Sequence, residues 1–232
     1  MAGDPNQRLA VGLPRHHRRG AINTFSYIGL NYTTATNALI LNSAAPIFIV
    51  AFCYLIFGDR ITPRQLCGIA VSIIGVLIVV LRGDLGSLTH MTLNRGDVLV
   101  LTGMACWGLY TAILRKRPAI APLSFAACTF AASAAVNIPL ALIEASMGYL
   151  PRMSLSTLGM IAYAGIFPSV FAYLLYNRGV ELIGGGRAGV FNHLVPVFGA
   201  VLAFTFLGET PGLHHAAGFA MILAGVWLAA RA

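Results

Sequence analysis

The sequence predicts an all-α protein that crosses a membrane several times, and three features of composition and pattern predict it. Hydrophobic residues make up 58% of the 232 positions, whereas charged residues make up only 9%. A soluble domain carries about 25% charged residues, so water cannot be the only solvent of this chain. The apolar residues gather in runs of about 20, the length that a helix needs to span the hydrocarbon of a bilayer. Short polar segments connect these runs.

Seven apolar segments are long enough to span a bilayer, and an eighth is shorter. The seven predicted spans cover residues 37–57, 64–82, 97–115, 122–146, 157–177, 187–207 and 213–230. The eighth segment, 21–34, follows a cluster of Arg and His residues that do not enter hydrocarbon easily. Thr62-Pro63 and Thr210-Pro211 each predict a helix start, with Thr as N-cap and Pro at the first helical position. We therefore expect about seven full spans and one partial span.

The distribution of basic residues predicts the orientation of these spans. If the N-terminus is cytoplasmic and each of the eight segments crosses once, 12 of the 15 Lys and Arg residues fall on the cytoplasmic side. The other three, Arg82, Arg95 and Arg152, fall on the far side. This asymmetry follows the positive-inside rule and predicts a topology with both termini inside. It also explains the net charge of +8 without a nucleic-acid partner. The expected surroundings are a lipid bilayer, in a cell membrane of the bacterial inner-membrane type.

An internal repeat joins two distant parts of the chain. Residues 29–79 align with residues 179–229 without a gap, at an offset of 150 residues. The matched identities are mainly Gly, Pro and Asn, among them Asn42 with Asn192 and Pro46 with Pro196. Such fixed-offset similarity indicates a duplication. Five predicted crossings separate the copies, so the copies are inverted in the membrane, as in alternating-access transporters with a midplane substrate site.

Four sequence motifs carry a resemblance to a known family. They are "YIGLNYTTATNALILNSAAPIF", "FGDRITPRQLCGIAVSIIGVLIV", "GDVLVLTGMACWGLYTAILRK" and "FLGETPGLHHAAGFAMILAGVWLA". Over residues 21–231 the chain resembles the EamA type of the drug/metabolite transporter superfamily. The resemblance implies ten spans in two inverted five-span halves, which export or exchange small metabolites through a cavity between the halves. It implies a basic non-membrane segment 1–20, an incomplete first repeat 21–82, an external linker 83–96 and a complete second repeat 97–231. The first two to three of the ten spans are expected to be missing.

Polar residues and prolines inside the predicted spans are the first candidates for the substrate path. Asn42 and Asn192 either hydrogen-bond neighbouring helices or line the path. Pro46 and Pro196 each remove a backbone hydrogen bond and bend their helix. The bend is either a fixed structural kink or frees a carbonyl for a ligand.

Two ionisable residues and four aromatic residues complete the candidates. His193 aligns with Ser43, so the duplication does not preserve it; it is either a satisfied neutral imidazole or a proton relay. Glu144, an acid inside an apolar run, is the candidate for ion or proton coupling, unless it reaches the headgroups. Pairs of aromatic residues three positions apart either line a cavity for amphipathic or aromatic solutes or pack in the core. These residues are Trp107, Tyr110, Tyr173 and Tyr176.

The sequence thus predicts a secondary transporter that exports or exchanges small organic metabolites by alternating access. The first alternative is a truncated or inactive fragment of such a transporter. The second is a multispan membrane enzyme, but the motifs H-E-x-x-H and G-x-S-x-G do not occur. We expect no enzymatic activity, no cofactor and no metal site, and no phosphate-binding G-x-x-x-x-G-K-S/T motif is present. The four Cys residues are interpreted as packing residues, and the pattern specifies no oligomeric state.

Overall fold

A computed structural model describes residues 28–90, 94–148, 153–208 and 210–231 of the chain. In these residues every regular element is a helix and no β-strand occurs, which confirms the predicted all-α fold class. The predicted N-terminal segment 1–20 lies outside the described residues, and so do residues 21–27 of the partial span.

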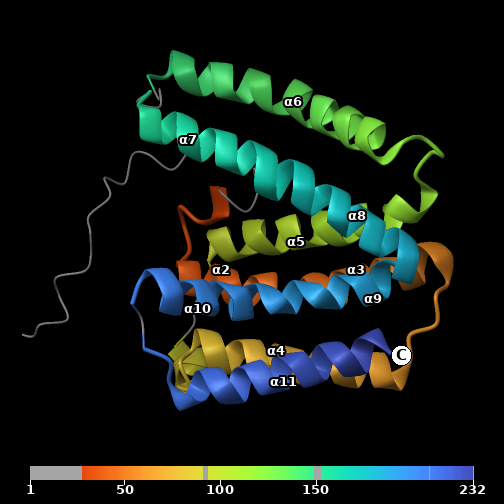
Figure 1. Cartoon of the computed structure of the whole chain (residues 1–232), viewed down its shortest axis with the longest axis vertical. Coiled ribbons are helices and arrows are strands. Elements are labelled where there is room, and N and C mark those ends of the chain that lie inside the picture. The colour runs from red at the N-terminus through yellow and green to blue at the C-terminus, as the bar shows by residue number, and fades with distance from the viewer. Residues whose placement is uncertain (1–27, 91–93, 149–152, 209, 232) are drawn as a thin grey trace, which may run out of the picture.

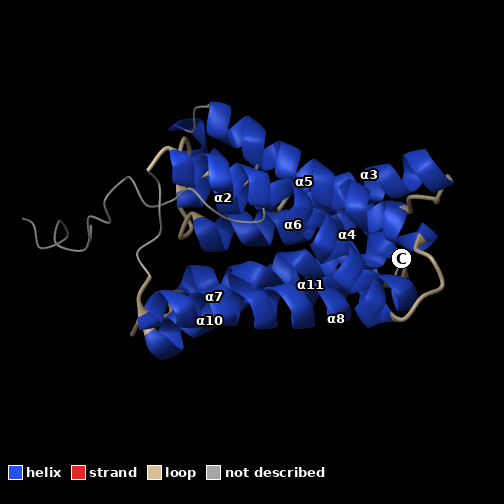
Figure 2. Cartoon of the chain, turned by 90° about the horizontal axis from the view of Figure 1, so that it is seen from above, coloured by secondary structure: helices blue, strands red, loops and turns tan. Residues whose placement is uncertain are grey.

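The helices run along one common direction, and α6 and the α4–α11 pair lie at opposite edges of the bundle (Figures 1 and 2). The elements are α2 (Ala35–Asn42), α3 (Ala45–Phe57), α4 (Pro63–Val80), η2 (Leu85–His90), α5 (Arg95–Ile113), η3 (Leu114–Lys116), α6 (Pro122–Ser146), α7 (Leu155–Ala164), η4 (Gly165–Phe171), α8 (Ala172–Ile183), α9 (Gly185–Val190), η5 (Phe191–Leu194), α10 (Val195–Phe206) and α11 (Leu213–Ala230).

These elements join into seven helical segments in the described chain that are long and apolar enough to cross a membrane. They match the seven predicted spans, so the span prediction is confirmed in number and approximate position. The fifth segment, Leu155–Ile183, is longer than the predicted 157–177. It contains a stretch of π-helix around Pro168, which has no N–H for the regular helix ladder. No residue of α7, at the start of this segment, is buried, and in a bilayer lipid tails cover such a surface.

One of the two predicted helix starts is confirmed and the other is wrong. The Thr62 hydroxyl accepts a hydrogen bond from the Gln65 N–H at 3.1 Å, and Pro63 is the first residue of α4. In the second copy, Gly212 is the N-cap of α11, and Thr210-Pro211 precede it in the loop. The Gly212 N–H donates to Nδ1 of His215 at 3.0 Å. Because a His side chain in the first turn satisfies the helix end, the Thr-Pro pair is not used there.

Helices α4 and α11 pack against each other at glycines and in opposite directions. A Cβ atom built on Gly68 would lie 2.6 Å from the carbonyl oxygen of Gly225, and one built on Gly75 would lie 2.8 Å from that of Gly218. The 150-residue offset exchanges these two contacts, so an approximate twofold axis relates the helices. Antiparallel packing about such an axis is the arrangement expected of inverted copies. The glycines allow the two backbones to touch.

The main apolar core lies beside this pair. Its buried residues come from α3, α4, α9 and α11, and they are Val50, Ile69, Val76, Val79, Val190, Ile222, Val226 and Ala229. A second cluster, Ile49, Cys53 and Ala112, joins α3 to α5. The core therefore holds helices of both copies together and leaves α6 and α7 at the margin.

Ion pairs gather several loops at one end of the bundle, here called the arginine-rich end. Arg115 pairs with Asp59 at 2.7 Å, while Arg117 and Arg178 pair with Glu181 at 2.9 and 2.8 Å. These residues belong to the connections predicted to be cytoplasmic. The alternation of loops between the two ends therefore agrees with the structure, while the membrane side of each end stays a prediction. The predicted external linker 83–96 contains η2, and α5 already begins at Arg95.

Candidate substrate path

The four predicted aromatic residues meet in one group between α5 and α8, here called the aromatic cluster. The ring centroid of Trp107 lies 5.5 Å from that of Tyr110, 5.6 Å from that of Tyr173 and 4.9 Å from that of Tyr176. The three-residue spacing places each pair on one helix face, and the packing of α5 near α8 turns the two faces together. Phe130 of α6 adds an edge contact to Tyr173 at 5.6 Å.

The hydroxyl groups of the cluster differ in their partners. The Tyr110 hydroxyl donates to Oδ1 of buried Asn177 at 2.9 Å, and the Tyr176 hydroxyl shares a 2.9 Å hydrogen bond with the Thr111 hydroxyl. The Tyr173 hydroxyl has no hydrogen-bond partner in the part of the chain that the structure describes. Tyr110 and Tyr176 are thus fixed by the protein, whereas the polar end of Tyr173 is left for water or a solute.

Asn42, Asn192, His193 and Pro196 come together around a small cavity of about 10 Å³ between the two copies. Leu39, Ser43 and Val76 complete its lining. The Asn192 side chain also lies beside the Tyr176 hydroxyl. Its buried Nδ2 atom, however, has no hydrogen-bond partner among the described residues. A buried donor without an acceptor costs about 1–3 kcal/mol, and the Tyr176 hydroxyl is the acceptor beside it. A role of Asn192 in the substrate path stays a prediction.

His193 has a different environment from its neighbour Asn192. It is 1% exposed, with Nδ1 at hydrogen-bond distance from the Ser72 hydroxyl and Nε2 at 2.9 Å from the carbonyl oxygen of Ser43. Because a carbonyl only accepts, Nε2 carries the proton in this contact. Ser43 is the residue aligned with His193 by the repeat, so the pair lies near the twofold axis. There the imidazole links the two copies, and its role in the substrate path stays a prediction.

Both predicted prolines follow a break in their span. Asn42 is the last residue of α2, and Pro46 lies in the first turn of α3. In the second copy η5 contains Asn192, and Pro196 lies in the first turn of α10. The missing proline N–H explains why the regular ladder stops near each Asn. Each span therefore contains an irregular turn at the matched position, next to the small cavity.

Glu144 is part of α6, but its side chain lies outside the described residues. The proposed coupling of an ion or proton through this carboxylate therefore stays a prediction.

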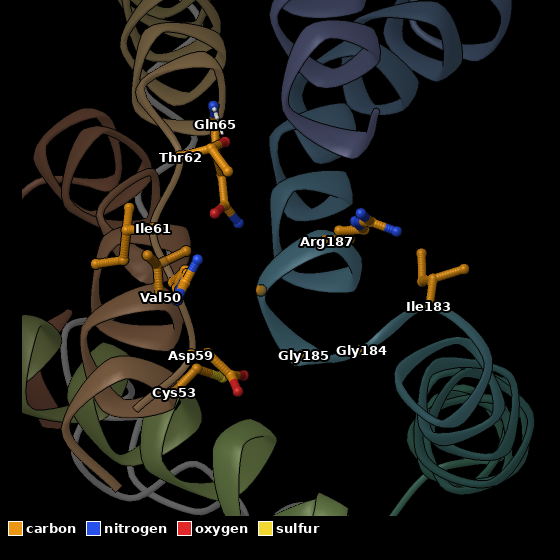
Figure 3. Close-up of a pocket in the computed structure, with 12 residues that line it drawn as sticks. Val50, Cys53, Asp59, Ile61, Thr62, Gln65, Ile183, Gly184, Gly185 and Arg187 are labelled. Carbon is orange, nitrogen blue, oxygen red and sulfur yellow. Dashed lines mark hydrogen bonds between the residues drawn. The ribbon is translucent and has the colours of Figure 1, made fainter. Parts of the chain in front are cut away.

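A larger cavity of about 260 Å³ opens at the arginine-rich end. Figure 3 shows Gln65, Cys53 and Asp59 facing Gly184 and Gly185 across it. A Cβ atom built on Gly185 would lie 3.2 Å from Sγ of Cys53 and 3.4 Å from the Cγ2 methyl of Thr111. The Thr111 hydroxyl also shares a hydrogen bond with the Tyr176 hydroxyl. Thr111 therefore connects the wall of this cavity at Gly185 to the aromatic cluster.

The sequence pattern did not reveal Thr111 and Asn177, which position the aromatic cluster, or Ser72, which contacts His193. Each is a buried polar residue in an apolar helix, and two of them adjoin a predicted Tyr in the chain. A search for isolated polar residues inside the spans would have found them. The cavity at residues 184–186 was missed because the three glycines predicted only a loop.

Comparison with known proteins identifies the family. The EamA-like transporter family matches residues 20–81 and 94–231. The chain belongs to the EamA-like transporter family. It is 28% identical over 205 residues to the uncharacterized transporter YyaM of Bacillus subtilis, with 88% of this chain and 67% of that protein covered. It is 33% identical over 207 residues to an uncharacterized transporter of Archaeoglobus fulgidus, with coverage of 88% and 70%.

Two further similarities add to this assignment. A probable terminal-alkyne amino-acid exporter of Streptantibioticus cattleyicolor is 25% identical, with 86% of this chain and 65% of that protein covered. A solved crystal structure superimposes with a TM-score of 0.74 at 19% identity, covering 92% of this chain and 74% of the other. That similarity shows a shared fold. With its seven apolar helical segments, this EamA-like chain is a multi-pass membrane protein of a transporter family.

Proposed function

We propose that this EamA-like protein is a secondary transporter that exports or exchanges small organic solutes by alternating access. The two moving units are the repeats 21–82 and 97–231, joined by the linker 83–96, in a bacterial-type inner membrane. The observation that carries the proposal is the unpaired Asn192 Nδ2, buried at the seam of the repeats beside Tyr176 and Asn42. An inverted repeat with irregular helices near a midplane site is typical of alternating-access transporters.

The proposed path has three parts. A solute leaves the cavity at the arginine-rich end, passes Thr111 and reaches the aromatic cluster. From there it contacts Asn192 at the break between η5 and α10. The breaks before Pro46 and Pro196 provide the positions where the helix halves can change angle.

The chemistry of the path favours amphipathic or aromatic solutes with a polar or cationic group. Three tyrosine rings with centroids 4.9–5.6 Å from that of Trp107 offer flat apolar faces, which also attract cations. The Tyr173 hydroxyl and the Asn192 amide offer hydrogen bonds. An amino-acid exporter among the relatives makes amino-acid-like solutes the first class to test.

The test is counterflow of labelled amino acids and aromatic amines into proteoliposomes that contain the purified chain. We expect uptake of at least one aromatic solute, and Tyr173→Phe should weaken its apparent affinity about fivefold, the worth of one hydrogen bond. Tyr163→Phe is the matched control, because Tyr163 is exposed on α7 and stacks only on Phe167. No counterflow for any solute, or equal effects of the two variants, would contradict the proposal.

A further inference from the structure

Two arginines flank the same tryptophan at the arginine-rich end. Trp227, near the end of α11, is 52% exposed. The guanidinium carbon of Arg231 lies 4.4 Å from its ring centroid, and that of Arg64 lies 5.7 Å from it. Arg64 belongs to the first turn of α4 and Arg231 caps α11. The antiparallel packing of these helices thus builds the group, here called the Arg–Trp–Arg site.

The charge of this site is not neutralised by the described part of the protein. At this end of the bundle, the described carboxylates of the protein are already paired. Asp59 pairs with Arg115, and Glu181 pairs with Arg117 and Arg178. No described carboxylate forms an ion pair with Arg64 or Arg231. Two guanidinium groups held within 6 Å of one ring centroid therefore attract an anion from outside.

A second aromatic ring at the same end shows the contrasting case. Arg115 and Lys116 lie 5.1 and 5.4 Å from the ring centroid of Phe57. There Asp59 accepts a hydrogen bond from Arg115 at 2.7 Å. The protein supplies an anion beside Phe57, and it supplies none beside Trp227 among the described residues.

The inverted repeat provides a further comparison within the chain. The 150-residue offset maps Trp227 onto Leu77, Arg231 onto Leu81 and Arg64 onto His214. The matching groove at the other end of the α4–α11 pair therefore has two Leu residues in place of Trp and Arg. Since both ends of this symmetric pair pack through the same glycine contacts, helix packing does not require the Arg–Trp–Arg site. Its presence at one end points to a ligand found at one membrane face.

We propose that Arg64, Trp227 and Arg231 bind the phosphate headgroup of an anionic phospholipid. Guanidinium groups bind phosphate through paired hydrogen bonds, and Trp prefers the depth of the headgroups. The glycerol and the upper acyl chain of a lipid can pack against the exposed part of the indole. A soluble anion has no apolar part that would need this surface. The positive-inside prediction places this end at the cytoplasmic leaflet, where anionic lipids concentrate. The lipid would connect one helix from each repeat.

Tryptophan fluorescence tests this proposal directly, because the chain contains only Trp107 and Trp227. Trp107→Phe leaves Trp227 as the sole reporter. In bilayers with brominated lipids, we expect phosphatidylglycerol to compete for Trp227 more strongly than phosphatidylcholine, by about fivefold for each arginine engaged. The double variant Arg64→Gln/Arg231→Gln should reduce this preference to about one. Arg60→Gln, at an exposed arginine of the same end, should leave it unchanged.

Native mass spectrometry gives a second measure with Trp107 in place. The double variant should retain fewer phosphatidylglycerol molecules than the Arg60→Gln control. Equal quenching by the two lipids, or an undiminished preference in the double variant, would overturn the proposal. Binding of inorganic phosphate to the detergent-solubilised protein that the double variant abolishes, together with equal quenching by the two lipids, would assign the site to a soluble anion and overturn the proposal as well.

Discussion

Asn192 and His193 are neighbours in the chain, yet their side chains have opposite hydrogen-bonding states. His193 is buried with a partner for each ring nitrogen, in Ser72 and Ser43. Asn192 keeps a buried Nδ2 that no described group accepts. The contacts of the imidazole are thus complete within the described protein, whereas those of the amide are not, and this difference is why we propose Asn192 and not His193 as the solute contact.

Replacement of Asn192 by Leu tests this difference at the residue scale. We expect Asn192→Leu to lower solute uptake about tenfold, because a solute loses its buried hydrogen-bond donor, about 1–2 kcal/mol. Expression and thermal stability should hold, since the protein itself makes no bond to Nδ2. The measurement is initial counterflow rate together with the melting temperature in detergent.

Asn137→Leu is the control for this variant. Asn137 lies in α6 and donates to the carbonyl oxygen of Ser133 in its own helix at 2.8 Å. Unchanged uptake kinetics in Asn192→Leu would show that the amide serves only the packing of helices.

At the scale of elements, the α4–α11 pair packs backbone to backbone, whereas the spans of Pro46 and Pro196 each contain an irregular turn. A Cβ atom on Gly218 would lie 2.4 Å from Cγ2 of Val79 and 2.8 Å from the carbonyl oxygen of Gly75. Backbone atoms cannot move aside as a flexible side chain can.

Gly218→Ala should therefore destabilise the protein by about 1–3 kcal/mol, the usual cost of overpacking. Gly159→Ala should instead be neutral or stabilising by up to about 1 kcal/mol, because helical Ala is favoured over Gly. Nothing lies within 4 Å of a Cβ atom at Gly159. The readout is the midpoint of thermal unfolding in detergent, and equal shifts in the two variants would contradict the close packing of α4 and α11.

At the scale of the whole molecule, the ends of the bundle differ in charge although the central helix pair is symmetric. Ion pairs fasten the connections after α3, α5 and α8 at the arginine-rich end. At the other end Gly83 lies beside His214: a Cβ atom built on Gly83 would lie 3.5 Å from the Cβ atom of His214. This difference in charge is what orients such a protein during membrane insertion.

Reporter fusions test the orientation. A reporter joined after Arg231 should give a cytoplasmic signal, because this residue lies at the arginine-rich end. A reporter joined after Gly148, in the connection that follows α6, should give a periplasmic signal. Interchanged signals would reverse the predicted topology without changing the fold.

The sequence could predict the parts of the fold that depend on local pattern. Hydrophobic runs predicted all seven spans, and the matched Pro46 and Pro196 predicted that their two helices depart from regular geometry. It could not predict that Gly212 would cap α11, because this choice depends on the conformation of His215. It also could not rank the site residues, since the partners of Tyr110 and Tyr176 lie 65 or more positions away.

The sequence by itself determined that the chain is a multi-pass helical membrane protein with an internal repeat, because hydrophobicity and periodicity act along the chain. The tertiary structure decided which polar groups are satisfied. It brought Ser43 and His193 together at the twofold axis, left Asn192 Nδ2 unpaired and placed Arg64 against Trp227. Hydrogen bonds and ion pairs depend on atoms a few ångströms apart in space, and distance along the chain does not reveal them.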